Sequence, residues 1–126
     1  MPDLFFFYIV DVDETGHKYG WGSPEYYASL VRADEAVGLL LDALAASPDS
    51  KGTAVVLTSD HGGKPDGKHG TYDIRDFRTP LFIRDGRGKG EISSFMMQYD
   101  VASVLAQFLD LEIPAEWRGR VCKELQ

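Results

Sequence analysis

The feature that most restricts the fold is the order of three short apolar runs along the chain. Residues 4–10, 53–58 and 79–84 contain mostly apolar, aromatic or β-branched side chains without a polar alternation. Such continuous runs are typical of strands that are buried on both faces. We therefore predict three strands, which form the centre of a mainly parallel sheet.

Amphipathic segments separate or follow these runs. A helix is predicted from about residue 24 to residue 46, because Ser23 suits a helix cap, Pro24 the first turn and Glu25 the positive end of the helix dipole. A second helix is predicted after Asp100, which should cap it, and residues 47–50 should form a turn. Strands alternating with helices predict the α/β class, as a layered sandwich whose central sheet is flanked by helices.

The composition excludes several classes of protein. The 126 residues carry a net charge of −7, which argues against the nucleic-acid backbone as a partner. One cysteine allows neither an internal disulfide nor a cysteine metal cluster. Residues 4–10 are too few to span a bilayer, and no basic residue precedes them as in a signal peptide. We expect no membrane partner and no targeting segment within these residues, which leaves the natural compartment open and the expressed chain cytoplasmic.

Polar clusters follow two of the predicted strands. DVDETGH occupies residues 11–17, directly after the first run, and SDHGG occupies residues 59–63, directly after the second. Ligands of open α/β sheets bind beyond the carboxyl ends of the strands, so both clusters should lie at one edge. All three histidines of the chain belong to these clusters or to the loop that follows: His17, His61 and His69.

Histidines beside carboxylates and glycines predict a metal centre. Imidazole and carboxylate ligands together favour Zn²⁺, although other divalent ions are compatible with them. Asp13, His17 and His69 would give one ion three ligands and leave a position open for water or substrate. Asp60 and His61 would hold a second ion roughly 4 Å away, the spacing of two-metal phosphoryl-transfer sites.

The same residues carry a resemblance to a known family. The D-x-x-G-H of residues 13–17, the TSDHGG of residues 58–63 and the KHG of residues 68–70 occur in the order found in the alkaline phosphatase superfamily. KYGW after His17, Thr79-Pro80 and the late WRGR extend the likeness over nearly the whole chain. The sequence most closely resembles the type I phosphodiesterase/nucleotide pyrophosphatase branch.

The resemblance implies a partial active site. Asp13, His17 and His69 match one zinc site of the family, while Asp60 and His61 match part of the second. The family's nucleophilic Ser or Thr and another metal-binding Asp lie earlier in its chain and have no match here. Residues 1–126 therefore look like the C-terminal part of a metallohydrolase domain for small phosphate, phosphodiester or sulfate esters. We expect one or two Zn²⁺ ions and weak or no activity of this chain alone.

Two alternatives remain open. FYIVDVDET also fits the haloacid dehalogenase signature, in which Asp11 would be the nucleophile, Asp13 the acid/base and Mg²⁺ the cofactor. In the second alternative, the chain is a metal-binding or interaction module without catalytic activity.

Three further expectations concern surfaces. The basic residues Lys64, Lys68, Arg75 and Arg78 either contact an anionic group or are solvated loop charges. Trp21 either stacks on a base or forms a wall of the site. An unpaired edge at residues 4–10 would favour a homodimer or aggregation.

Overall fold

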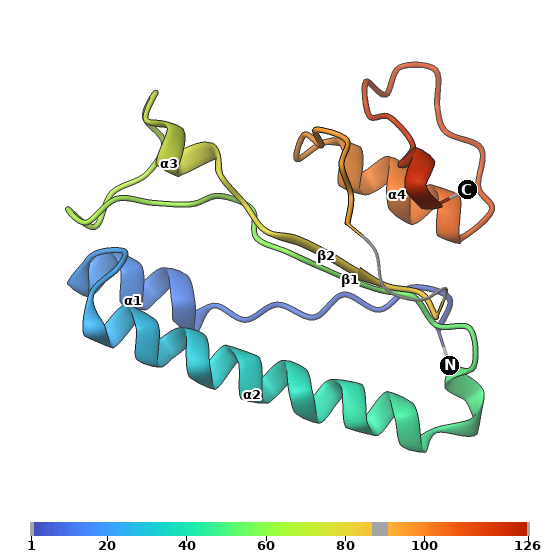
Figure 1. The fold of residues 1–126 in the computed structure, drawn as a ribbon, viewed down its shortest axis with the longest axis horizontal. Helices are drawn as coiled ribbons and strands as arrows, with labels where there is room; N and C mark the ends of the chain where they lie inside the picture. Colours follow the sequence, from blue (N-terminus) through green and yellow to red (C-terminus); the bar gives the residue numbers. More distant parts are fainter. Residues whose placement is uncertain (1, 87–90, 126) are drawn as a thin grey trace. The chain divides into compact units, whose positions relative to one another are not determined.

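The computed structural model describes residues 2–86 and 91–125 (Figure 1). The chain forms two compact units. The first unit consists of the chain up to Lys51 together with His61–Thr79, and the second of Gly52–Asp60 together with the chain from Pro80.

Two helices packed against each other form the body of the first unit (Figure 1). These are α1, Asp11–Tyr19, and α2, Pro24–Ala46. The Tyr26 amide donates to Ser23 Oγ at 3.1 Å, which caps α2 at the predicted residue. A 3₁₀ turn, η1 (Pro48–Ser50), follows α2, and a single helical turn, α3 (Ile74–Phe77), lies late in the unit. The prediction for residues 24–46 is confirmed.

Helix α1 directly follows residues 4–10, at a place where the sequence predicted no helix. Its first turn carries Asp11, Asp13 and Glu14, whose negative charges favour the positive end of the helix dipole. Gly16 lies inside the helix, and Gly20 ends it with a φ of 90°. Asp13 and His17 consequently lie one turn apart on the same helix.

The prediction of a strand at residues 4–10 is wrong for this structure. The segment has no strand pairing, and most of its side chains are exposed, with Phe6 at 85%. A strand is stabilised by hydrogen bonds to its neighbour, and these residues have no such neighbour in the described part of the chain.

The second unit contains a two-stranded sheet. Strand β1 (Val55–Thr58) pairs with β2 (Leu81–Arg84), and Val55 lies opposite Arg84. Both strands fall within the predicted segments. The pairing is antiparallel, so the expected parallel sheet is not found among residues 2–86 and 91–125.

A small core surrounds helix α4, Asp100–Phe108, which lies where a helix was predicted, although Tyr99 and not Asp100 occupies the N-cap position. Asp100 is fully buried and accepts hydrogen bonds from the backbone amides of Met97 and Arg120, each at 2.8 Å. Burial by itself raises the pKa of Asp100, but these bonds and the Arg120 guanidinium lower it overall. The Arg120 bonds tie the segment that precedes the 3₁₀ turn η2 (Lys123–Leu125) to α4.

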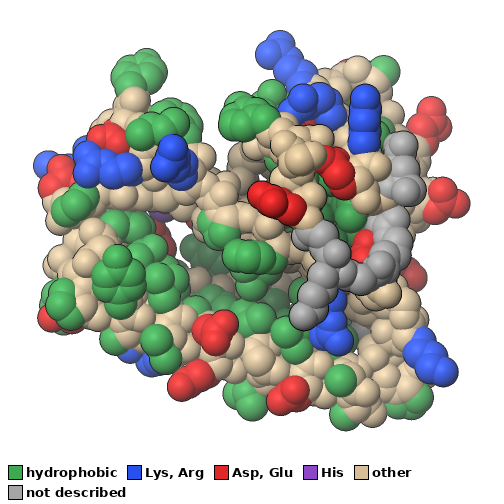
Figure 2. Space-filling view, viewed as in Figure 1, with side chains coloured by type: hydrophobic (Ala, Val, Ile, Leu, Met, Phe, Trp, Pro, Cys, Tyr) green, Lys and Arg blue, Asp and Glu red, His purple; other side chains and the backbone are tan. Residues whose placement is uncertain are grey.

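Apolar surface is extensive on both units. Only Val104, Ala106 and Cys122 are buried apolar residues among those described. Figure 2 shows apolar side chains distributed over the visible face. Helix α2 also exposes large apolar side chains, among them Val31 at 59% and Leu39 at 73%.

None of the helices in the described ranges combines the length and apolar character that a membrane crossing requires.

Candidate metal centre

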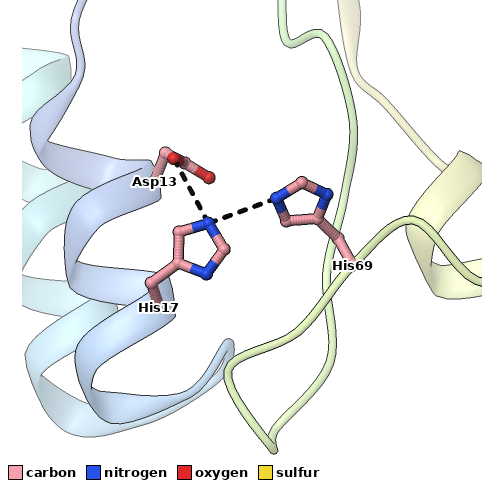
Figure 3. A group of neighbouring side chains, drawn as sticks. All are labelled: Asp13, His17 and His69. Carbon is pink, nitrogen blue, oxygen red and sulfur yellow. Dashed lines mark hydrogen bonds and ion pairs between the residues drawn. The ribbon is translucent and has the colours of Figure 1, made fainter.

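Helix α1 presents two of the predicted ligands on one face. Asp13 and His17 are four residues apart, so the helical period brings their side chains together. Asp13 Oδ2 lies 3.6 Å from His17 Nε2 (Figure 3). The side chains of both residues are partly accessible, at 32% for Asp13 and 46% for His17, so an ion has access to them from solvent.

His69 reaches the same point from the loop between His61 and α3. Its Nε2 lies 3.2 Å from Nε2 of His17 (Figure 3). One ligand atom from each of Asp13, His17 and His69 lies within 4.8 Å of the others. The structure thus brings together the three residues that the sequence assigned to one ion.

A backbone contact orients His17. Its Nδ1 lies 2.9 Å from the carbonyl oxygen of Gly67, and this nitrogen must donate because a carbonyl oxygen can only accept. In neutral His17 the lone pair is therefore on Nε2, which points toward His69 and Asp13. Gly67 has a φ of 74°, and a Cβ there would lie 2.6 Å from the His17 carbonyl oxygen. Glycine permits this close approach.

His61 lies beside the group of three. Its ring stacks on that of His69, with centroids 3.7 Å apart and planes at 19°. His61 Nδ1 donates to the carbonyl oxygen of Gly62 at 2.8 Å, and its Nε2 lies 3.8 Å from Asp13 Oδ1. Asp60 is exposed and belongs to the second unit. The assignment of Asp60 and His61 to a second ion stays a prediction.

Asp76 shapes the loop that carries His61 and His69. Its buried carboxylate accepts from the Thr71 amide at 2.7 Å and from the Thr71 hydroxyl at 2.6 Å. The hydroxyl bond is the main reason why the pKa of Asp76 is lowered. The Asp76 carbonyl oxygen also accepts from the Gly62 amide at 2.9 Å, which fixes the backbone directly after His61.

Two of the basic loop residues have acidic partners. Arg75 forms a bidentate pair with Asp73, in which Nη2 and Oδ2 are 2.6 Å apart. These hydrogen bonds lower the pKa of Asp73 strongly. Lys64 Nζ lies 3.7 Å from Asp66 Oδ2. These contacts order the loop, and the prediction that the loop cations meet an anionic group stays untested.

The donor set fits a divalent cation. Asp13 Oδ1 is buried without a hydrogen-bond partner, so a cation would satisfy an oxygen that the surrounding side chains do not. The 3.2 Å between the His17 and His69 nitrogens is close to the roughly 3.3 Å that separates two imidazole ligands of a tetrahedral Zn²⁺ ion. Two imidazoles and one carboxylate favour zinc or another first-row ion over magnesium.

Asp11 has a different environment. Arg32 donates to Asp11 Oδ2 from Nη2 at 2.6 Å and from Nε at 3.0 Å. Asp11 also begins a helix instead of following a paired strand. Both observations disfavour Asp11 as the nucleophile of a dehalogenase-type site.

The sequence alone did not identify the orienting role of Gly67 or the stacking of His61 on His69. The available signal was the glycine-rich composition of residues 59–78, which indicated close backbone approaches without showing where they occur.

Comparison with protein families gives an independent result. The family model described as type I phosphodiesterase / nucleotide pyrophosphatase matches residues 1–100. No solved structure matches this chain.

The similar proteins include a phosphate transferase, a sulfatase and a phosphodiesterase by name. GPI ethanolamine phosphate transferase 1 of Yarrowia lipolytica is 37% identical over 141 aligned residues, covering 94% of this chain and 15% of that protein. N-acetylglucosamine-6-O-sulfatase of Bacteroides thetaiotaomicron is 32% identical over 84% of this chain and 20% of that protein. Venom phosphodiesterase CdcPDE of Crotalus durissus collilineatus is 39% identical over 48% of this chain and 7% of that protein. The chain thus spans a fifth or less of the length of these relatives.

Proposed function

Because the chain belongs to the type I phosphodiesterase/nucleotide pyrophosphatase family, within the alkaline phosphatase superfamily, we propose that it carries the metal-binding part of a hydrolase or transferase for phosphate-type esters. In this proposal residues 1–126 are the C-terminal part of such a domain, whose complete form has a layered, mainly parallel sheet. Asp13, His17 and His69 hold one divalent cation, for which zinc is the preferred ion.

The observation that carries this proposal is the convergence of these three side chains from α1 and the following loop. His17 and His69 are 52 residues apart in the sequence, yet one ligand atom from each of the three residues lies within 4.8 Å of the others. The match to the family model over residues 1–100 includes all three.

A bound dication would supply the positive charge that an ester anion requires in a chain of net charge −7. The protein's own contribution is to hold two imidazole nitrogens and a carboxylate close enough to one another to bind the same ion. The Gly67 carbonyl oxygen fixes the orientation of His17. Asp60 and His61 would contribute to a second cation site.

The relatives' names and the charge of the chain support a proposal for the substrate class. The names refer to phosphodiesters, ethanolamine phosphate transfer and a sulfate ester, all with a tetrahedral anionic centre. We propose a small anionic ester as the substrate. No nucleophile is assigned, because the described Ser23 acts as the α2 cap and the resemblance offers no other match.

Metal analysis combined with substitution tests this proposal. Protein purified without chelator should contain about one equivalent of zinc. Each of the substitutions Asp13→Ala, His17→Ala and His69→Ala should weaken zinc binding more than roughly 100-fold, which is the upper range for residues that contact a ligand and not the ion itself. Asp11→Asn is the matched control, because it removes a carboxylate charge from the same helix turn and should leave zinc affinity nearly unchanged. Zinc binding that survives all three alanine substitutions would refute the proposed site.

Activity separates an enzyme part from a binding module. We expect little or no hydrolysis of a chromogenic phosphodiester by these 126 residues alone. Brisk hydrolysis that depends on His17 would show that the chain contains a complete active site. Mg²⁺-dependent hydrolysis that Asp11→Asn abolishes would favour the dehalogenase-type alternative.

A further inference from the structure

Trp21 lies next to the three histidines without belonging to the ligand set. Its ring centroid is 5.2 Å from that of His17 and 5.9 Å from that of His69, with interplanar angles of 83° and 77°. His61 lies at 6.5 Å and 58°. Edge-to-face contacts of this kind fix the orientation of aromatic rings. One indole therefore contacts all three imidazoles of the chain.

The indole is held between α1 and the histidine loop by two glycines. A Cβ at Gly16 would lie 2.6 Å from Cε2 of Trp21, and a Cβ at Gly63 would overlap the same fused bond of the indole. Only residues without a side chain allow both backbones to come so close. The Trp21 amide also donates to the Lys64 carbonyl oxygen at 3.2 Å, which links the segment after α1 to the loop.

These contacts decide between the two roles considered for Trp21. An indole packed against two backbone segments and next to three imidazoles is part of the wall of the site. The same contacts connect the element that carries His17 to the loop that carries His69, which helps to explain why their Nε2 atoms are 3.2 Å apart.

We propose that Trp21 is a positioning residue that holds His17 and His69 at ligand distance before an ion binds. The inference rests on the proposed metal site and deepens it. Without the indole, the packing between Gly16 of α1 and Gly63 of the loop would be lost, and ion binding would have to order both histidines at a cost in affinity.

The test compares Trp21→Ala with Trp21→Phe and, as the matched control, Trp117→Ala, which removes the chain's other tryptophan. Zinc affinity is measured by competition with a chromogenic chelator, and the visible absorption of bound Co²⁺ reports the coordination geometry. Trp21→Ala should weaken zinc binding about 10- to 100-fold, the range of outer-shell substitutions, and alter the Co²⁺ spectrum. Trp21→Phe keeps a ring between the glycines and should recover most of the loss, whereas Trp117→Ala should change neither quantity.

A second readout needs no metal. In the metal-free protein, the ring protons of His17 and His69 should show a nuclear Overhauser effect that Trp21→Ala removes. Gly63→Ala keeps the tryptophan but displaces the indole, so it should act in the same direction even if Trp21→Ala does not fold. Gly38→Ala, where a Cβ meets nothing within 4 Å, is its control.

The possible outcomes separate the two proposals. Wild-type protein that binds no zinc would refute the proposed metal site, and the Overhauser effect would then decide the role of Trp21 by itself. Wild-type protein that binds zinc, together with unchanged affinity and an unchanged Overhauser effect in Trp21→Ala and Gly63→Ala, would overturn only the inference about Trp21.

Discussion

His17 Nε2 and His69 Nε2 lie 3.2 Å apart, although 52 residues separate the two histidines along the chain. In the absence of an ion this contact is a hydrogen bond. Because the His17 Nδ1 hydrogen is donated to Gly67, neutral His17 accepts at Nε2 and His69 donates. An ion that binds both nitrogens replaces this hydrogen bond, so the arrangement is close to the one that ligation requires.

The backbone at Gly67 should matter for metal affinity as well as for stability. Gly67→Ala places a Cβ 2.6 Å from the His17 carbonyl oxygen at a φ of 74°. We expect a loss of about 1–3 kcal/mol in the free energy of unfolding from backbone strain and contact. Displacement of His17 should also weaken zinc binding by about tenfold or more. Chemical denaturation and zinc competition measure the two effects.

Gly52→Ala is the matched control for this substitution. Gly52 has a φ of 84°, but a Cβ there meets nothing within 4 Å. The Gly52→Ala variant should lose unfolding free energy through backbone strain, whereas its zinc affinity should not change. Equal zinc affinity in the Gly67 and Gly52 variants would show that the Gly67 contact does not position His17.

Ser23 should contribute to stability and not to metal binding. Ser23→Ala removes the oxygen that accepts from the Tyr26 amide at 3.1 Å, and loss of such a cap costs about 1 kcal/mol. Helix content by circular dichroism and the denaturation midpoint should fall, while zinc stoichiometry stays the same. A Ser23→Thr variant should retain most of the stability, whereas loss of zinc in Ser23→Ala would contradict a role limited to capping.

Local signals account for the parts of the fold that were predicted correctly. The boundaries of α2 follow from a capping serine, a proline and an uninterrupted helical period, all of which act within a few residues. Helix α4 lies where a helix was predicted, but the Asp100 carboxylate does not cap it and accepts from the amides of Met97 and Arg120 instead. Both observed strands lie inside predicted segments, because short β-branched runs indicate strands before any partner is known.

Pairing and close contacts were harder to predict because they depend on residues far apart in the sequence. Residues 4–10 have the composition of a strand, but strand formation needs a neighbour, and none is paired with them among the described residues. Helix α1 was not predicted, because glycine is a poor helix former, whereas the packed indole of Trp21 explains a glycine at residue 16. The grouping of Asp13, His17 and His69 was predicted from residue chemistry, but the position of His61 against His69 was not.

Acid should weaken the contact between Glu124 and the serines before it in the chain. Glu124 Oε1 accepts from the Ser94 hydroxyl at 2.7 Å, from the Ser94 amide at 3.0 Å and from the Ser93 hydroxyl at 3.1 Å. The Ser94 hydroxyl is the main cause that lowers the pKa of Glu124 from 4.5 to about 2. Since the folded pKa is the lower one, the stabilisation is complete above pH 4.5 and is lost as the pH falls toward 2.

The Glu124→Gln variant provides the comparison. It removes the titrating group, so its denaturation midpoint should depend less on pH between 4.5 and 2 than that of the wild type. The effect should be small, because Glu124 is exposed and its interactions are weakened by solvent. Identical pH profiles for the two proteins would contradict the assignment.

The exposed segment at residues 4–10 should make the protein associate with itself. Phe5, Phe6 and Tyr8 are 65%, 85% and 61% exposed, and the segment pairs with no strand in the ranges that the structure describes, so a second copy can add both apolar contacts and hydrogen bonds. We expect a dimer or larger species in light scattering, and Phe6→Asp should shift the population toward monomer. Tyr72→Asp, which changes an even more exposed aromatic residue outside the segment, should leave the distribution unchanged. A monomer at high concentration in the wild type, or an equal shift in both variants, would show that residues 4–10 do not drive association.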